Sequence, residues 1–131
     1  MIVLLDTFVV VRALDGSLPE AVREAIRAAD AVYTSAASAW EIATKFRIGK
    51  FPQFSRRQVE SFADACVDLG ANPVAIEAID GIAAGLIDSD HHDPFDRMIA
   101  AQSTRLRATV ITPDPAFDLF PGVRRWWLSN A

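Results

Sequence analysis

The chain has 131 residues, of which 51% are hydrophobic and 23% are charged, so it has enough apolar material for a folded core and is not a disordered chain. Its net charge of −4 argues against a globally basic nucleic-acid-binding protein, although a local basic face is compatible with it. The single cysteine excludes an intrachain disulfide, and there is no signal-peptide pattern and no apolar stretch near the roughly 20 residues of a membrane span, so we expect a cytoplasmic protein without membrane contact.

Before residue 50, short apolar runs alternate with amphipathic segments. The expected elements are a strand at 2–5, helices at 7–14 and 19–29, a strand at 31–35 and a helix at 36–48. The first strand, IVLL, is apolar throughout and ends at Asp6, which is typical of a buried parallel strand. Gly49 follows the last of these helices and is suited to end it.

The same alternation continues in the second part of the chain. The expected elements are a helix at 55–69, a weak strand at 72–76, a helix to about residue 86, a helix at 94–106, a strand at 108–113, a turn or short helix in DPAFDLF and an edge strand in VRRWWL. Asp93 followed by Pro94 has the pattern of a helix N-cap and the first helical residue. Strands alternating with helices predict one domain, residues 1–131, with an α/β fold in which a mainly parallel sheet has helices on both faces.

Four acidic residues fall where the carboxyl ends of the expected strands should lie: Asp6, Glu41, Asp96 and Asp114. Ligands of open α/β sheets bind beyond this edge. Each acid alone can be read as a helix cap or first-turn residue. Four ionised carboxylates in one cleft would repel one another, however, and would stay ionised only around cations. Carboxylate oxygens suit Mg²⁺ or Mn²⁺, so the sequence predicts a site for one of these ions.

Several polar residues lie next to these acids in the sequence. Asp93 is better interpreted as the helix cap than as a metal ligand. His91 and His92 are open to an acid–base role or to a structural one. Arg97 directly follows Asp96 and can pair with a carboxylate or a phosphate, and we favour the ion pair.

Three hydroxyl residues also lie beside the acids in the sequence. Thr7, Ser38 and Thr112 are candidates to hydrogen-bond the ligating carboxylates from behind, and their alternative roles are caps and strand ends.

The segment 42–59 contains no Asp or Glu and has a local excess of positive charge. Its basic residues include Lys45, Arg47 and Lys50, which with Arg97 are our candidates for contact with the phosphates of a nucleic acid. Phenylalanines interleave with these residues, and a place in the core is the preferred interpretation for them. Contacts with a protein partner or a second copy of the chain remain an alternative for the basic residues.

Four motifs together resemble a known family: LLDT at the N-terminus, SAWEIATK at 38–45, HHDPFDRMIAAQ at 91–102 and TPD at 112–114. They resemble PIN-domain proteins, specifically VapC-type toxins of bacterial toxin–antitoxin pairs. The resemblance implies an α/β/α fold and an Mg²⁺- or Mn²⁺-dependent endoribonuclease in which Asp6, Glu41, Asp96 and Asp114 form the catalytic metal site. It also implies an RNA substrate, a cognate antitoxin and a homodimer.

The chain departs from this family pattern in a few places. Phe8 stands where relatives in this subgroup commonly have His, and Arg12 stands where an apolar or aromatic residue is common. Pro113 and Pro115 flank Asp114 and restrict its backbone. These departures keep open the alternative of a catalytically inactive PIN-like module that binds RNA or a partner.

Other α/β folds fit the sequence less well. A phosphoreceiver domain needs a lysine after a late strand, and the last strand region has none. A haloacid dehalogenase-type phosphatase needs a second Asp at position 8, which is Phe. A dinucleotide-binding domain needs the G-x-G-x-x-G motif, which is absent from the sequence.

Overall fold

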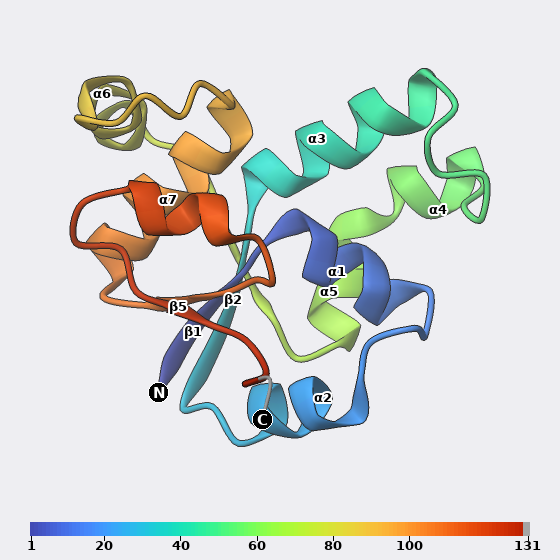
Figure 1. The fold of residues 1–131 in the computed structure, drawn as a ribbon. Coiled ribbons are helices and arrows are strands. Elements are labelled where there is room, and N and C mark those ends of the chain that lie inside the picture. Colours follow the sequence, from blue (N-terminus) through green and yellow to red (C-terminus); the bar gives the residue numbers. More distant parts are fainter. Residues whose placement is uncertain (130–131) are drawn as a thin grey trace.

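Parallel strands form the centre of the molecule, and the computed structural model describes residues 1–129 (Figure 1). The five strands are β1 (Ile2–Leu5), β2 (Ala31–Ser35), β3 (Asn72–Val74), β4 (Thr109–Ile111) and β5 (Arg125–Trp126). Their order in the sheet is β3-β2-β1-β4-β5, and every pair is parallel. The carboxyl ends of β1, β2 and β4 therefore lie side by side at one edge of the sheet.

Helices cover both faces of this sheet, as the sequence predicts (Figure 1). They are α1 (Thr7–Leu14), α2 (Glu20–Arg27), α3 (Ala36–Arg47), α4 (Arg56–Glu60), α5 (Phe62–Asp68), α6 (Ala78–Leu86) and α7 (Pro94–Leu106), with a 3-10 helix, η1, at Pro115–Leu119. None of the helices within residues 1–129 combines the length and apolarity that crossing a membrane requires.

The central strand β1 supplies both halves of the core because its side chains alternate between the two faces. Val3 and Leu5 pack with α1, α2 and α5, whereas Leu4 packs with Ile99 of α7 and Phe117 of η1. All five of these side chains are almost completely buried. The result is a three-layer α/β/α fold whose α1 and α7 start beside the same edge of the sheet.

The continuous helix expected over 55–69 is wrong, because the chain bends at Ser61 between α4 and α5. Ser61 has φ −93° and ψ 15°, outside the helical range. No residue of α4 is buried, whereas Phe62 and Cys66 of α5 enter the core. The bend lets α4 pack beside α3 while α5 buries its apolar face against the sheet.

A buried carboxylate joins α6 to α7. Asp80 is 2% exposed and accepts hydrogen bonds from Arg105 Nε at 2.6 Å, Arg105 Nη2 at 3.0 Å and Gln102 Nε2 at 3.3 Å. It also accepts one from the backbone amide of Glu77 at 3.0 Å. These contacts fix the position of α6 against the long helix that carries Asp96.

Replacing Asp80 with Ala should lower the free energy of unfolding by about 1–3 kcal/mol, because the buried amide of Gln102 would lose an acceptor and the exposed guanidinium of Arg105 would lose its ion pair. Urea unfolding followed by circular dichroism measures this. The control is Asp118→Ala, which removes an exposed carboxylate that Arg125 binds through two nitrogens. The control should cost less than about 1 kcal/mol. Equal losses in the two variants would contradict a special role for the buried contact.

Candidate functional site

Asp6 is held between two neighbouring strands at the carboxyl edge of the sheet. It follows β1 directly, and its backbone amide donates to the carbonyl of Ile111 in β4 at 3.1 Å. One carboxylate oxygen accepts from the amide of Thr7 at 2.7 Å and so caps α1. The other accepts from the hydroxyl of Thr112 at 2.6 Å, and the whole side chain is 6% exposed. The carboxylate therefore has a fixed position at the point where β1 and β4 end.

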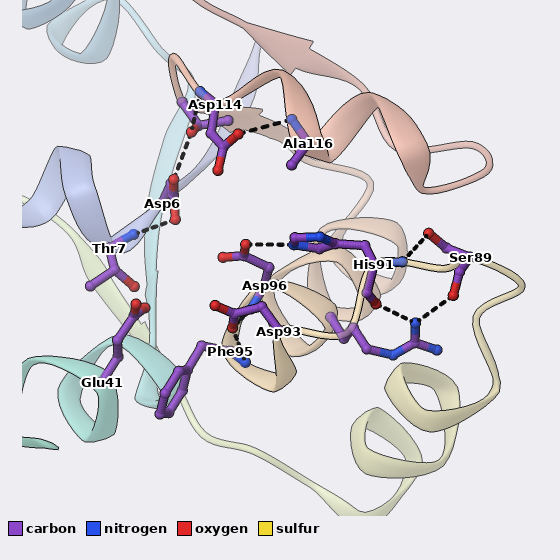
Figure 2. A network of polar contacts seen from close by, with 12 residues as sticks. Asp6, Thr7, Glu41, Ser89, His91, Asp93, Phe95, Asp96, Asp114 and Ala116 are labelled. Atoms are coloured by element: carbon purple, nitrogen blue, oxygen red, sulfur yellow. Dashed lines mark hydrogen bonds and ion pairs between the residues drawn. The ribbon is translucent and has the colours of Figure 1, made fainter.

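Asp96 lies in the first turn of α7, facing Asp6 (Figure 2). Asp93 caps this helix by accepting from the amides of Phe95 at 2.8 Å and Asp96 at 3.1 Å, which confirms the cap predicted for it. The carboxylate of Asp96 meets the Nε2 atom of His91 at 2.8 Å. We did not predict this contact, although the five-residue spacing across the N-cap was a signal that the two side chains can meet.

Glu41 reaches the same region from α3, two turns beyond Ser35 at the end of β2. Its Oε2 atom pairs with Lys45 Nζ at 2.5 Å, one turn further along the helix. Its Oε1 atom is buried and has no hydrogen-bond partner within the described residues 1–129. A buried carboxylate oxygen without a partner costs free energy, so this atom is positioned to accept a ligand.

These carboxylates face a common groove of about 540 Å³ (Figure 2). Its walls include the acids Asp6, Glu41, Asp93, Asp96 and Asp114. Among residues 1–129, however, no three Asp, Glu, His or Cys side chains are close enough to one another to form a closed metal-binding set. The acids thus line an open groove. Each of them accepts a hydrogen bond from a different partner.

Burial and mutual repulsion make two of these acids hard to ionise. The pKa of Asp6 is raised to about 7, chiefly by burial and in smaller part by the nearby charges of Asp96 and Glu41, against the lowering effect of the hydrogen bonds from Thr112 and Thr7. Burial likewise raises the pKa of Asp96 to about 6, with contributions from Asp93 and Glu41, while the bond to His91 opposes the rise. The groove therefore favours positive charge.

The other predicted residues of the site take different positions. Asp114 lines the groove, is exposed and caps η1 by accepting from the amide of Ala116 at 2.9 Å. Of the three candidate hydroxyls, Thr112 alone meets a carboxylate within residues 1–129, because Thr7 Oγ1 and Ser38 Oγ bond each other at 2.9 Å.

The structure divides the candidate basic residues into those inside and those outside the groove. Lys45 and Lys50 line it, whereas Arg47 lies on another surface of α3, beside Phe46 and α4.

The ion pair that we favoured for Arg97 is wrong. Its guanidinium makes five hydrogen bonds, all to backbone carbonyls, those of Ala84, Gly85, Ile87, Ser89 and His91. Because α6 ends at Leu86, the backbone carbonyls of the 84–91 segment have no amide donors from a continuing helix. The guanidinium of Arg97 donates hydrogen bonds to them instead. Arg97 thus fixes the loop that carries His91 through its guanidinium donors, and the RNA contact that we predict for it stays a prediction.

The raised pKa of Asp6 predicts how the stability of the metal-free protein depends on pH. The folded state holds the Asp6 proton more tightly than the unfolded state, so stability should fall as pH rises from about 4 to about 7. Asp6→Asn removes the charge but keeps an acceptor for the Thr7 amide. At pH 8 in EDTA, this variant should be more stable than wild type by up to about 3 kcal/mol, and the difference should shrink toward pH 4.

Urea unfolding at both pH values measures the difference. Asp88→Asn, a change of an exposed acid outside the groove, serves as the control and should leave stability close to wild type at both pH values. If Asp6→Asn lowered the stability at pH 8, the conclusion that the charge on Asp6 destabilises the metal-free protein would be refuted.

Comparison with solved structures shows similar folds in three complexes. VapBC2 from Rickettsia felis, bound to a promoter DNA fragment, matches with a TM-score of 0.72 and 18% identity over 96% of this chain and 98% of that chain. DNA-bound VapBC from Salmonella typhimurium matches with a TM-score of 0.70 and 17% identity over 96% and 97%. FitAcB from Neisseria gonorrhoeae matches with a TM-score of 0.64 and 20% identity over 95% and 96%. At these identities the likeness is one of fold.

Comparison at the level of sequence gives a family assignment. No curated protein matches this chain. The family model for the PIN domain matches residues 3–123, nearly the whole chain. The motif-based resemblance and the three-layer fold agree with this match, and the chain belongs to the PIN domain family.

Proposed function

We propose that this protein is a divalent-metal-dependent endoribonuclease that acts as the toxin of a VapC-type toxin–antitoxin pair in the cytoplasm. The observation that carries the proposal is that Asp6, Glu41 and Asp96, from three separate elements, face one groove at the carboxyl edge of the sheet. Members of the PIN domain family are generally metal-dependent nucleases, and this chain has kept the acids that such chemistry needs.

The residues of the groove fit Mg²⁺ or Mn²⁺. Their donor atoms are carboxylate oxygens, which these hard ions prefer. The buried Oε1 atom of Glu41 lacks a partner within residues 1–129, and burial raises the pKa of Asp6. A cation would satisfy the first atom and would stabilise the charged form of the second. In this proposal Asp6 and Asp96 hold the ion directly, and Asp114 supports it or helps hold a second one.

When bound, the ion would neutralise charge on the phosphodiester and lower the pKa of a bound water. The protein's own residues supply orientation. Thr112 holds the Asp6 carboxylate through a 2.6 Å hydrogen bond, and His91 holds that of Asp96 at 2.8 Å. Glu41 would use its Oε1 atom to hold a water of the ion or to orient the attacking nucleophile, while Lys45 fixes its other oxygen. Lys45 and Lys50, in the groove wall, contact RNA phosphates, and Arg47 adds positive charge on another surface of α3, outside the groove.

The proposed protein partners are a cognate antitoxin and a second copy of the chain. The complexes of similar fold, two VapBC assemblies and FitAcB, support the antitoxin. An apolar surface supports the homodimer: Ile79, Ile82 and Leu86 of α6 are 62%, 63% and 79% exposed, and lie at helical spacings of three and four. Exposed apolar surface of this kind marks protein interaction sites.

Replacing Ile82 with Lys should weaken the homodimer about tenfold or more, because a charge would enter an apolar interface. Sedimentation equilibrium measures the monomer–dimer constant. Ile48→Lys is the matched control, since Ile48 is 56% exposed at the end of α3, outside this surface. A dimer constant unchanged by Ile82→Lys would move the interface elsewhere, and a wild-type monomer would refute the dimer.

Asp6→Asn and Asp96→Asn should each reduce Mn²⁺-dependent cleavage of RNA by about 100-fold or more, because each removes a charged ligand of the ion. Gel analysis of labelled total RNA, incubated with purified protein, measures the rate. Asp88→Asn, outside the groove, should cleave at the wild-type rate. Wild-type rates in the two groove variants would refute the assignment.

A Mn²⁺ titration separates the nuclease from an inactive binding module. A working site should raise the thermal stability of wild type, by about 2.7 kcal/mol when the ion is present at 100 times its dissociation constant. The stabilisation should be largely lost in Asp96→Asn. Absence of both cleavage and stabilisation in wild type would favour the inactive module.

A further inference from the structure

The groove that holds the acids continues along α1, away from the carboxylates. This part of its wall includes Phe8, Val11 and Arg12 from α1, Asp15 at the end of α1, and Lys50 and Phe51 from the segment after α3. Phe8 and Arg12 are four residues apart and so lie on the same side of the helix. The groove therefore changes from a cluster of acids at its Asp6 end to a mixed wall of basic and aromatic side chains and one acid, Asp15, along α1.

Phe8 follows Asp6 by two positions, in the first turn of α1. Its side chain is 43% exposed and lines the groove. The guanidinium of Arg12 lies 5.0 Å from the centre of its ring, and the ring of Trp127 meets it edge-on at 6.5 Å between centroids. These contacts hold the ring in place while leaving much of it uncovered. An aromatic ring beside a guanidinium is a surface on which nucleobases stack.

The charges around Phe8 suit a phosphate. Neither Arg12 nor Lys50 forms an ion pair in the part of the chain that the structure describes, residues 1–129. Arg12 donates to the Ser17 hydroxyl at 3.1 Å. Asp15 also lines the groove and keeps its negative charge there, because its hydrogen bonds from the Ser17 amide at 3.0 Å, the Ser17 hydroxyl and Gln53, together with the nearby charge of Arg12, lower its pKa. This part of the groove wall thus carries two cations, Arg12 and Lys50, and one carboxylate, that of Asp15.

We propose that Phe8 is the stacking platform for a nucleobase adjacent to the scissile phosphate, and that Arg12 and Lys50 bind the next phosphate of the same strand. This inference rests on the proposed nuclease function and adds a binding residue to it. A base that stacks on Phe8 has left any duplex, so the protein reads an unpaired segment of RNA at this point. The ring then determines which substrates bind, and the carboxylates perform the reaction.

The test compares Phe8→Leu, which keeps an apolar side chain, with Phe8→Trp, which keeps an aromatic one. Each is made in the Asp6→Asn background, and binding of a fluorescein-labelled single-stranded RNA oligonucleotide in EDTA is measured by anisotropy. Phe8→Leu should weaken binding about 5- to 50-fold and Phe8→Trp by less than about twofold, since alanine substitution of a base-stacking aromatic costs affinity in this range. Binding of a blunt duplex of the same sequence should be equal in both variants.

Phe46→Leu is the matched control, because Phe46 lies outside the groove and should not affect binding. Affinity unchanged in Phe8→Leu would overturn the proposal and leave Phe8 as a contact for a protein partner. Equal weakening in Phe8→Leu and Phe8→Trp would also overturn it, because stacking would not explain the loss.

A cleavage assay separates this proposal from the nuclease function. With Mn²⁺ and otherwise wild-type protein, Phe8→Leu should raise KM about 5- to 50-fold with a smaller change in kcat. If wild type cleaves RNA and Phe8→Leu has the same KM, the stacking proposal alone fails. If wild type does not cleave RNA, the nuclease function fails, and the anisotropy measurement still decides whether Phe8 binds a base.

Discussion

Carboxylates at one edge of the sheet repel one another. The polar contacts at this edge depend on that constraint. Asp6 and Glu41 are buried and Asp96 is partly buried, all facing one groove. Each has a separate partner, Thr112, Lys45 and His91 respectively, that offsets part of the cost of its charge. The offset is incomplete, because the pKa of Asp6 still rises to about 7. A cation is the natural remaining partner for such a set.

The parallel sheet is what brings these charges together. With β1 between β2 and β4, three successive carboxyl ends meet at one edge, and α1, α3 and α7 begin beside it. The same arrangement buries Val3 and Leu5 on one face and Leu4 on the other. Stability and site thus share one element: the apolar side chains of β1 anchor the strand, and its last residue leads directly into Asp6.

The groove has two chemically different ends, and the difference suits a substrate that carries both charge and aromatic rings. Its acidic end can hold an ion but would repel a phosphate that arrived without one. Its other end presents Phe8, Arg12 and Lys50, which attract phosphate and base together. Phe8 is one of the positions where the chain departs from the pattern that the family resemblance leads us to expect, so that pattern does not itself point to a base-binding residue here.

Features that depend on neighbours in the chain could be predicted from the sequence by itself. The order of strands and helices, the cap at Asp93 and the gathering of acids at one edge follow from hydrophobic periodicity and from where each acid falls relative to a strand end. Tertiary structure decided the rest: the bend at Ser61, the carbonyl contacts of Arg97, the His91–Asp96 bond and the pairing of Thr7 with Ser38. Each of these depends on which surfaces pack together or on how a loop returns to its helix, and local residue preferences do not encode that, because a donor takes whichever acceptor the packing brings within reach.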